Sequence, residues 1–549
     1  MFTDEEKEIL KNYVTSAEAD IFAVKGMEGM VGAAYARYSR AKGGFREVLL
    51  KEFIKEGMID PKHAEELIER ILVAYGDDSV GELEGAHVSF ENVSALGEKA
   101  IVDHRIGGAF IVQSTRYVYY DQKTEAGTYR YYRDPDIMAS PLAGEYVRVM
   151  DLCFDTYVEL MPALKEYMEK RKSINDAEYD INGDGEKEKL ADLTDEKEIK
   201  AFKRTYNGDL RAKVCDTLRV LLPLSTFHNV GVFGNGRFYQ GMVSTFYTSP
   251  LAEMRDMGKK AHDGLNQIIP KYVKRAKKNE YVAGVEAAMQ KLADEILAGA
   301  EPEKAQEVAL LSQPMSQQEF DLSTTALMLY AYSNLPLGQI TKIVSALPSD
   351  KVDLIRQTYI GERKTRRDRP GRALEDGYPY KFDLLVTYQV FKDLQRHRMS
   401  SQIWQRFTPE QGFYVPEELQ ELGLTDKLLH CEAEVRQLNQ KLRGAGLLEQ
   451  SQYAVLHGHK TRWVLQANDR ALMHLLELRT TPQGHPEYRK VSQEMHRKIK
   501  ERSPWRAGMM NFVDYDDYYW SRADSEARQR VKESQLDKKK AETAGDSPA

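Results

Sequence analysis

The sequence predicts an α+β protein in which one module occurs twice in tandem. The first observation is a pair of stretches, residues 91–105 and 384–398, that both end in His-Arg. Each stretch carries apolar residues at intervals of three and four, the spacing of a helix with one buried face. Many helices share that spacing, so this match alone does not establish a repeat.

A second pair of landmarks strengthens the case for a duplication. The segments Asn235-Gly236-Arg237 and Asn468-Asp469-Arg470 are each followed by a helix-like run. In both places the run leads into Thr-x-Pro, then a glutamate, then an arginine. Landmarks that recur in one order at two places are hard to obtain by chance, so we infer an internal repeat.

The repeat defines the expected domains. We expect the first module to cover residues 1–300 and the second to cover residues 301–524. The first module contains a charged stretch near residues 175–200 with few large apolar residues, which is typical of a solvent-exposed insertion or loop. Residues 525–549 are charged and then small and polar, which indicates a disordered tail.

The composition excludes several kinds of protein. The chain has 549 residues and a net charge of −7, so no global basic field favours nucleic acid. Its three cysteines, Cys153, Cys215 and Cys431, are far apart and support neither a disulfide framework nor a metal site. The start is acidic and polar, and no apolar run is long enough for a bilayer. We therefore expect a cytoplasmic protein with small-molecule partners and no membrane partner.

Other ligand signatures are weak or missing. Asp180 to Gly185 resembles the start of a calcium loop, but Ala191 stands where a bidentate glutamate is needed. An ordinary turn is the better interpretation, and no metal site is predicted. The chain also lacks the glycine-rich fingerprints of dinucleotide and P-loop sites.

The strongest candidate for an anion site is Arg396-His397-Arg398. Arg398 is expected one turn beyond Leu394 on the apolar stripe of its helix, and a buried arginine is costly unless an anion pairs with it. The alternative is a helix C-terminus that carries positive charge to suit the helix dipole.

Residues 106–117 form a second candidate. Gly107 and Gly108 allow close backbone approach, and Ser114 and Thr115 place hydroxyl donors beside Arg116, a combination suited to a phosphate. The alternative is a loop that leads into an aromatic strand at residues 117–120.

Two further arginines end helical runs. Arg219 lies at the edge of the buried side of a helix predicted over residues 211–222, where it can reach into a cleft. Arg479 closes the leucine-rich run that begins at Ala471. A cap on that helix is the alternative for Arg479.

Together these residues resemble the signature motifs of the flavin-dependent thymidylate synthases. The similar segments are Arg396-His397-Arg398, Ser114-Thr115-Arg116-Tyr117, Arg219 before Leu221-Leu222-Pro223, Leu478-Arg479, the Asn-x-Arg motifs at 235–237 and 468–470, and Tyr75–Glu82, which lacks the family's histidines. The resemblance covers most of both modules and is specific only in combination.

The resemblance implies a fold of mixed helices and antiparallel-rich sheet, with the two modules forming a pseudo-dimer within the chain. It also implies an enzyme that methylates dUMP to dTMP. In that family FAD takes a hydride from NADPH, methylenetetrahydrofolate gives the methylene group, and no cysteine nucleophile is used. Catalysis then rests on positioning and electrostatics, with the flavin carrying the redox chemistry.

The family's contacts can be carried over residue by residue. The residues that correspond to the family's dUMP contacts are Ser114, Thr115, Arg116, Tyr117, Arg219 and Arg479. Of these, Ser114 and Arg479 are the expected catalytic residues. The residues that correspond to its FAD contacts are Arg396, His397, Arg398, Asn468, His104, Arg105 and Asn235.

Each module departs from the family pattern in a different place. The departures are Asp103 and Phe246 in the first module, where the family has arginines, and Arg406, Thr408 and Gln452 in the second, where it has Ser, Arg and the phosphate arginine. The losses are largely complementary, so we expect one competent type of site per chain and a homodimer that forms a pseudo-tetramer. Two alternatives stay open: a related enzyme acting on another pyrimidine nucleotide or one-carbon donor, and a non-catalytic flavin- or nucleotide-binding protein.

Overall fold

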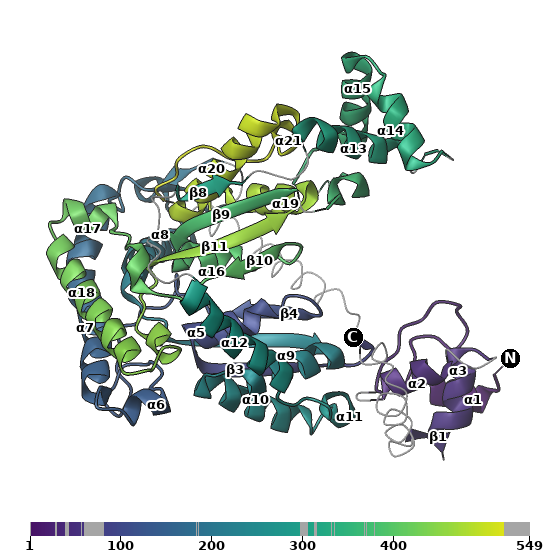
Figure 1. Ribbon diagram of the computed structural model, residues 1–549, viewed down its shortest axis with the longest axis horizontal. Helices are drawn as coiled ribbons and strands as arrows, with labels where there is room; N and C mark the ends of the chain where they lie inside the picture. Colours follow the sequence, from purple (N-terminus) through teal and green to yellow (C-terminus); the bar gives the residue numbers. More distant parts are fainter. Residues whose placement is uncertain are drawn as a thin grey trace. The chain divides into compact units, whose positions relative to one another are not determined.

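A computed structural model describes residues 2–27, 30–38, 43–55, 58–59, 82–182, 184, 186–296, 306–311, 316–330, 332–333, 335–366, 368, 370–377 and 379–520 (Figure 1). The chain forms two compact units that interleave along the sequence. The first unit comprises Met1–Gln113, Tyr131–Pro141 and Ser225–Pro302, and the second comprises Ser114–Arg130, Leu142–Leu224 and Glu303–Ala549.

The first unit is built on a three-stranded antiparallel sheet in the order β3-β7-β4. Its strands are β3 (Gly85–Ser94), β4 (Gly108–Val112) and β7 (Phe227–Asn235). Alternate residues of β7 are buried, among them Val230 and Val232, because successive side chains of a strand point to opposite faces. Helices α5 (Ala95–Asp103), α9 (Gly236–Thr248) and α10 (Ala252–Leu265) pack against these strands.

The second unit is built on a four-stranded antiparallel sheet in the order β10-β11-β9-β8. Its strands are β8 (Val308–Leu310), β9 (Tyr380–Thr387), β10 (Ser401–Trp404) and β11 (Lys460–Ala467). Helices α16 (Tyr388–Leu394), α19 (Asp469–Arg479) and α20 (Pro486–Arg502) pack beside the sheet and one another.

The remaining elements surround these two cores. In the first unit they are α1 (Asp4–Leu10), α2 (Val31–Tyr38), α3 (Phe45–Val48), β1 (Ile54–Lys55), β2 (Met58–Ile59), α6 (Pro135–Met138), α11 (Pro270–Val273) and α12 (Glu280–Ile296). In the second unit they are α7 (Ala143–Arg171), β5 (Glu178–Tyr179), β6 (Glu188–Lys189), α8 (Glu196–Leu218), α13 (Gln317–Tyr330), α14 (Leu337–Ser345), α15 (Ser349–Ile360), α17 (Glu417–Glu421), α18 (Thr425–Gly444) and α21 (Pro504–Met509).

The topology confirms the tandem duplication and the α+β class. In each unit a strand runs directly into a short helix (β3 into α5, β9 into α16), and a shorter strand follows (β4, β10). A later strand (β7, β11) then pairs between these two and leads into a helix pair (α9 and α10, α19 and α20). Both halves of the chain therefore encode the same order of elements and the same strand pairing.

The helix caps repeat as well. Ser94 and Thr387 cap α5 and α16 through their hydroxyl oxygens, and each hydroxyl donates to a glutamate on the second helix of the repeated helix pair, Glu253 on α10 or Glu487 on α20. Such a hydroxyl at a helix start accepts from backbone N–H groups that would otherwise lack a partner. The glutamate after Thr-x-Pro, a landmark of the repeat, therefore fixes the strand-to-helix junction in both units.

The long helices α7 and α8 belong to the second unit although they precede β7 in the sequence. Helix α7 packs along α18, and the Sγ atoms of Cys153 and Cys431 lie 3.7 Å apart in that contact. Helix α8 ends at Leu218 and passes into a single 3₁₀ turn, Arg219–Leu221. The boundary near residue 300 stays a prediction for the repeats, since these units are spatial and interleave.

The structure corrects one expectation about local structure in part and does not bear out one alternative interpretation. The stretch 175–200 is not an exposed loop throughout: it contains the β5–β6 hairpin, and the buried Tyr179 packs on Phe202 with ring centroids 5.0 Å apart. Residues 117–120 form no strand. Among the helices that the structure describes, none is long and apolar enough to cross a membrane.

Candidate active site

The site is built from arginines of both halves of the chain, all within the second unit. Arg116 follows the turn that starts at Ser114, and its Nε lies 2.7 Å and its Nη2 2.5 Å from the two carboxylate oxygens of Asp216 on α8. Its Nη1 also donates to the carbonyl oxygen of Gln483 at 3.3 Å. A bidentate pair of this kind, almost completely buried, holds the guanidinium plane in one orientation.

Arg219 lies where α8 gives way to the 3₁₀ turn, and 4% of its surface is exposed. Its Nε donates to the side-chain oxygen of Gln389 at 2.8 Å. Its Nη2 is buried without a hydrogen-bond acceptor, and the nearest carboxylate, Asp393, is 4.0 Å away. A buried guanidinium nitrogen of this kind is a donor ready for an anion.

Gln389 links Arg219 to the half-buried Glu487. The amide nitrogen of Gln389 donates to one carboxylate oxygen of Glu487, and the hydroxyl of Thr387 donates to the other. Burial raises the pKa of Glu487 despite these hydrogen bonds. Arg219, Gln389 and Glu487 thus form a chain of hydrogen bonds whose geometry is set by the first turn of α16 and the start of α20.

His485 lies beside this chain as the N-cap of α20. Its Nδ1 accepts from the backbone N–H of Glu487 at 3.2 Å. Burial, followed by the charges of Arg219 and Arg116, holds the pKa of His485 well below its usual value. The imidazole is therefore neutral and adds no charge to the site.

Asp393 on α16 lies at the centre of the arginines. Burial alone would raise its pKa, but Arg219, Arg396, Arg479 and Arg116, in that order of effect, hold the pKa below its usual value. The carboxylate is therefore ionised. Two of these arginines come from segments before residue 225 and two from the second half of the chain.

Arg479 and His397 form the other side of the site. Nε of Arg479 donates to Nε2 of His397 at 2.9 Å. Burial, then Arg479 and then His474, hold the pKa of His397 well below its usual value. His397 is thus a neutral acceptor with its proton on Nδ1.

A cavity of about 670 Å³ opens beside this pair. Its lining combines donors with apolar side chains: Glu375, Gly377, Arg396, His397, Arg398, Met399, Ser400, Ala467, Asn468, Arg470, Ala471, His474, Leu475, Leu478 and Arg479. Asn468 caps α19 by accepting from the N–H of Ala471 at 2.9 Å, so its side chain has a structural role at the cavity wall. The expectation that Arg398 lies on a buried helix face is wrong, because α16 ends at Leu394 and Arg398 is exposed.

In the first unit, aromatic rings occupy the equivalent place. Phe246 stands where Arg479 stands in the second unit, and its ring meets that of His104 edge-on at 5.7 Å. Phe238 stands where Ala471 stands, and it packs so closely that a Cβ on Gly234 or Gly108 would come within 2.1 Å or 2.6 Å of its ring. Phe238 thus fills space that corresponds to the open cavity of the second unit.

The residues predicted for the site therefore fall into two groups. Seven lie in the second unit, around Asp393 or on the wall of the 670 Å³ cavity: Arg116, Arg219, Arg396, His397, Arg398, Asn468 and Arg479. The predicted residues of the first unit, His104, Arg105 and Asn235, lie with the aromatic rings. His104 Nδ1 bonds to the carbonyl of Ala100 at 3.0 Å, and Asn235 caps α9 by accepting from Phe238 N–H at 2.8 Å.

The remaining predicted residues lie at or near Arg116. The hydroxyl of Ser114 accepts from the N–H of Arg116 at 3.3 Å, Thr115 is buried, and Tyr117 is 45% exposed. Within the motif 75–82, residues 75–81 lie outside the described part of the chain. Glu82 is described, and it pairs with Arg237 at 2.6 Å in the first unit.

Sequence reasoning missed Asp216, Gln389, Asp393 and Glu487. Comparison of the repeats could have found two of them, since the first module has Leu96 where Gln389 stands and Ala100 where Asp393 stands. A polar residue that replaces an apolar one in a repeat, on an otherwise buried helix, signals a function for that copy.

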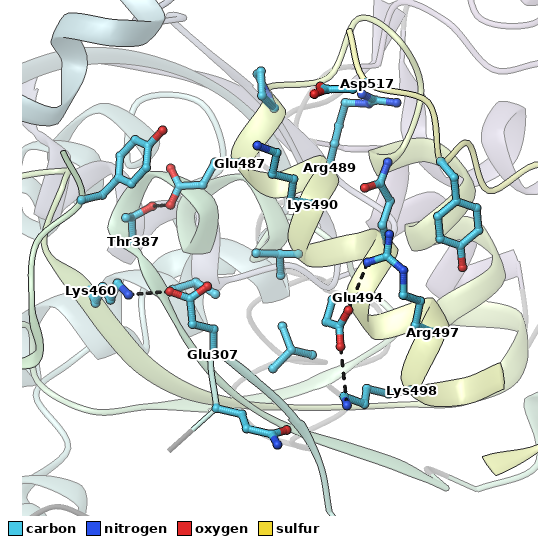
Figure 2. Close-up of a pocket in the computed structure, with 18 of the residues that line it drawn as sticks. Glu307, Thr387, Lys460, Glu487, Arg489, Lys490, Glu494, Arg497, Lys498 and Asp517 are labelled. Carbon is cyan, nitrogen blue, oxygen red and sulfur yellow. Dashed lines mark hydrogen bonds and ion pairs between the residues drawn. The ribbon is translucent and has the colours of Figure 1, made fainter. Parts of the chain in front are cut away.

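A second cavity, of about 1040 Å³, opens on the far side of Glu487 (Figure 2). Figure 2 shows Glu487 pointing toward Thr387, with Lys490, Arg497 and Lys498 on the same helix. Most of the charged side chains that line this second cavity form local ion pairs, for example Lys460 with Glu307 at 2.5 Å and Arg497 with Glu494 at 3.1 Å. Across the described residues, no group of three or more His, Cys, Asp or Glu side chains could hold a metal ion.

These features define a class of protein: a tandem-duplicated α+β protein with an arginine-rich site suited to a small anionic ligand. The chain belongs to the thymidylate synthase complementing protein family, whose profile matches residues 26–271 and 364–505. The two matched segments fall in the two halves of the chain, as the duplication requires.

The chain also resembles proteins of its own length. It is 32% identical to a UPF0159 protein of Chlamydia muridarum (strain MoPn / Nigg) over 96% of this chain and 99% of the relative. It is 32% identical to a UPF0159 protein of Chlamydia pneumoniae over 96% and 98% of the two chains. A UPF0159 protein of Thermoplasma acidophilum is 29% identical over 91% of this chain and 98% of the relative.

Proposed function

We propose that the protein methylates dUMP to dTMP in a flavin-dependent reaction that uses methylenetetrahydrofolate and a reduced nicotinamide. The observation that carries the proposal is the convergence of Arg116, Arg219, Arg396 and Arg479 on one place in the second unit. The family membership supports the reaction class. The complementary losses of the two modules support one competent site per chain.

The cavity beside Arg396 and His397 fits the FAD that this reaction needs. Guanidinium groups of Arg396, Arg398 and Arg470 suit a pyrophosphate, and Leu475 and Leu478 offer an apolar surface for a flat ring. FAD, when bound, supplies the redox chemistry by accepting a hydride from NADPH and delivering it to the transferred carbon.

The chain's own residues bind and orient the nucleotide. Arg219, with its free Nη2, holds the phosphate, and the rigid Arg116–Asp216 pair and the Ser114 hydroxyl border the same place. Arg479 keeps its terminal nitrogens for the pyrimidine carbonyl because its Nε is bound to His397. Since His397 accepts that bond and stays neutral, it does not compete as a cation for the phosphate.

No cysteine serves as nucleophile in this proposal. Cys153, Cys215 and Cys431 are buried, and burial raises the pKa of Cys215 to about 12. A thiol with so high a pKa is almost entirely protonated at neutral pH and is a poor nucleophile. The uracil must therefore be activated by the arginines and by the hydride donor.

Release of tritium from 5-tritiated dUMP tests the reaction directly. The purified protein with FAD, NADPH and methylenetetrahydrofolate should release tritiated water, and Arg219→Gln should lose at least about a hundredfold in kcat/KM, because a charged hydrogen bond to the phosphate is lost. A matched control is Arg462→Gln, which removes an arginine paired with Asp383 on the sheet. Absence of tritium release, with FAD bound, would contradict the proposal.

We also propose that two chains form a homodimer with the symmetry of a pseudo-tetramer, since each chain supplies two copies of the module. Light scattering on the purified protein tests this, and a mass of one chain, 62.9 kDa, would refute it. Flavin titration addresses the number of sites. One FAD per chain is expected, and two equivalent FAD sites per chain would refute the division of labour.

A further inference from the structure

We propose that Asp393 is a specificity-determining residue that restricts the anion bound at Arg219 to a single phosphate group. This inference rests on the proposed function to the extent that it concerns the same anion site. It adds a reason for the site to accept a nucleoside monophosphate and to reject the corresponding di- and triphosphates.

The position of Asp393 next to the free donor is the first step. Arg219 has one guanidinium nitrogen, Nη2, that is buried and lacks an acceptor, and Oδ2 of Asp393 lies 4.0 Å from it. At that distance the carboxylate attracts Arg219 without forming a hydrogen bond. A phosphate oxygen that accepts from Nη2 is therefore held within a few ångströms of a negative charge.

The charge of the site is the second step. Four arginines, Arg219, Arg396, Arg479 and Arg116, lie close enough to Asp393 to lower its pKa, and Arg116 is itself paired with Asp216. The nearby Lys213 pairs with Glu418 at 2.9 Å, and His397 and His485 are neutral. A phosphate monoester carries about −1.5 to −2 at pH 7, and Nη2 of Arg219 offers it a buried donor next to Asp393.

A longer phosphate chain does not match this site. A nucleoside diphosphate carries about one more negative charge than the monophosphate, and that charge is repelled by the ionised Asp393, which lies 4.0 Å from Nη2 of Arg219. Because unit charges several ångströms apart in a partly buried site interact strongly, each added ligand charge should cost about tenfold or more in affinity.

The repeat offers an internal comparison. In the first module the residue equivalent to Asp393 is Ala100, and Phe246 stands in place of Arg479. The carboxylate is therefore present in the copy that faces the arginines and absent from the copy filled by aromatic rings. A buried ionised carboxylate is costly, so its presence on α16 requires the cations around it.

Binding of four anions to the full-length protein, with FAD bound so that the flavin cavity is filled, tests the proposal: orthophosphate, pyrophosphate, dUMP and dUDP, each by titration calorimetry. The wild-type protein should bind orthophosphate at least about tenfold more tightly than pyrophosphate, and dUMP more tightly than dUDP by a similar factor. Asp393→Asn should reduce both ratios by at least about tenfold, and Asp393→Glu should preserve them. Asp383→Asn, which removes an equal charge from the partner of Arg462, should leave both ratios unchanged.

Three results would overturn the proposal. The first is wild-type protein that binds pyrophosphate as tightly as orthophosphate, a result that does not depend on whether a variant folds. The second is an Asp393→Asn protein, folded by circular dichroism, whose affinities shift equally for all four anions, as expected of a purely structural counter-ion. The third is wild-type protein that binds neither inorganic anion. Selective phosphate binding without dUMP binding would instead contradict only the proposed function.

Discussion

Nε of Arg479 lies 2.9 Å from Nε2 of His397 and donates a hydrogen bond to it. The two residues are 82 positions apart, and each ends a different strand-and-helix segment of the second module. The contact holds the imidazole in a single tautomer and directs the remaining nitrogens of Arg479 away from it.

Removal of the Arg479 charge should raise the pKa of His397. Burial is the larger cause of the lowered pKa and remains in Arg479→Gln, but the repulsion from the guanidinium is lost. We expect the His397 pKa to move back toward its usual value, and dTMP formation to fall by about a hundredfold. NMR titration of the imidazole checks the first result. An unchanged His397 pKa would show that the two side chains do not interact in solution.

Exchange of one residue between the repeats should close the flavin cavity. Ala471→Phe places in the second unit the ring that Phe238 provides in the first, so we expect loss of bound FAD with the fold retained. The matched variant, Phe238→Ala, should destabilise the protein by about 3–5 kcal/mol through a core cavity while leaving FAD content unchanged. Absorbance at the flavin band and thermal melting distinguish these outcomes.

Gln389→Leu should weaken the nucleotide site through Arg219. The substitution introduces the leucine found in the first module at Leu96, and it leaves Nε of Arg219 and one oxygen of Glu487 without this partner. We expect a loss of about 1–3 kcal/mol, seen mainly as a raised KM for dUMP. Gln411→Leu, on the half-buried 3₁₀ turn Pro409–Gln411 away from Arg219, is the control. A change confined to kcat would contradict a positioning role.

The protein should lose stability as the pH falls below about 6.5. His397, His457 and His485 are buried, and their pKa values lie well below the usual value, so the folded protein keeps them neutral. The unfolded chain binds the protons first, and each histidine therefore contributes about 1.4 kcal/mol of lost stability per pH unit. Glu487, whose pKa is raised, opposes the effect of one of them.

Urea unfolding between pH 5 and 7.5 measures this dependence. The slope of stability against pH should become shallower by about 1.4 kcal/mol per pH unit in His457→Gln. A variant that only weakens packing would lower stability equally at each pH. An unaltered slope would show that His457 takes up its proton equally in the folded and unfolded states.

The cysteines should be inert in the folded protein. Burial raises the pKa of Cys215 to about 12 and holds that of Cys153 well above its usual value. We expect no reaction with a thiol-specific reagent until the protein is unfolded, and full activity in Cys215→Ala. Loss of turnover in a folded Cys215→Ala protein would reopen a role for a thiolate.

The sequence predicted the duplication because its landmarks are residues that the fold requires. Asn235 and Asn468 cap equivalent helices, and Glu253 and Glu487 brace equivalent strand-to-helix junctions. These interactions are local, so residue type and spacing reveal them. The charged composition of residues 175–200 did not reveal the β5–β6 hairpin, because that hairpin is stabilised by contacts with Phe202 on the following helix.

The arginines of the site could be predicted from the sequence, but the polar residues that contact or surround them could not. Arg116, Arg219, Arg396 and Arg479 lie in recognisable motifs. Asp393 has no motif of its own, and its importance depends on arginines up to 277 positions away, as the separation from Arg116 shows. Long-range electrostatic contacts of this kind follow from how the interleaved segments pack, which no local pattern encodes.

The placement of α7 and α8 in the second unit makes the duplication difficult to reverse in evolution. Deletion of the second repeat would leave α7 without α18 and Arg219 without Gln389 and Asp393. Deletion of the first repeat would remove Arg116 and Arg219 themselves. Because α7 and α8 pack in the second unit, deletion of either repeat to restore a single-copy gene would destroy the site.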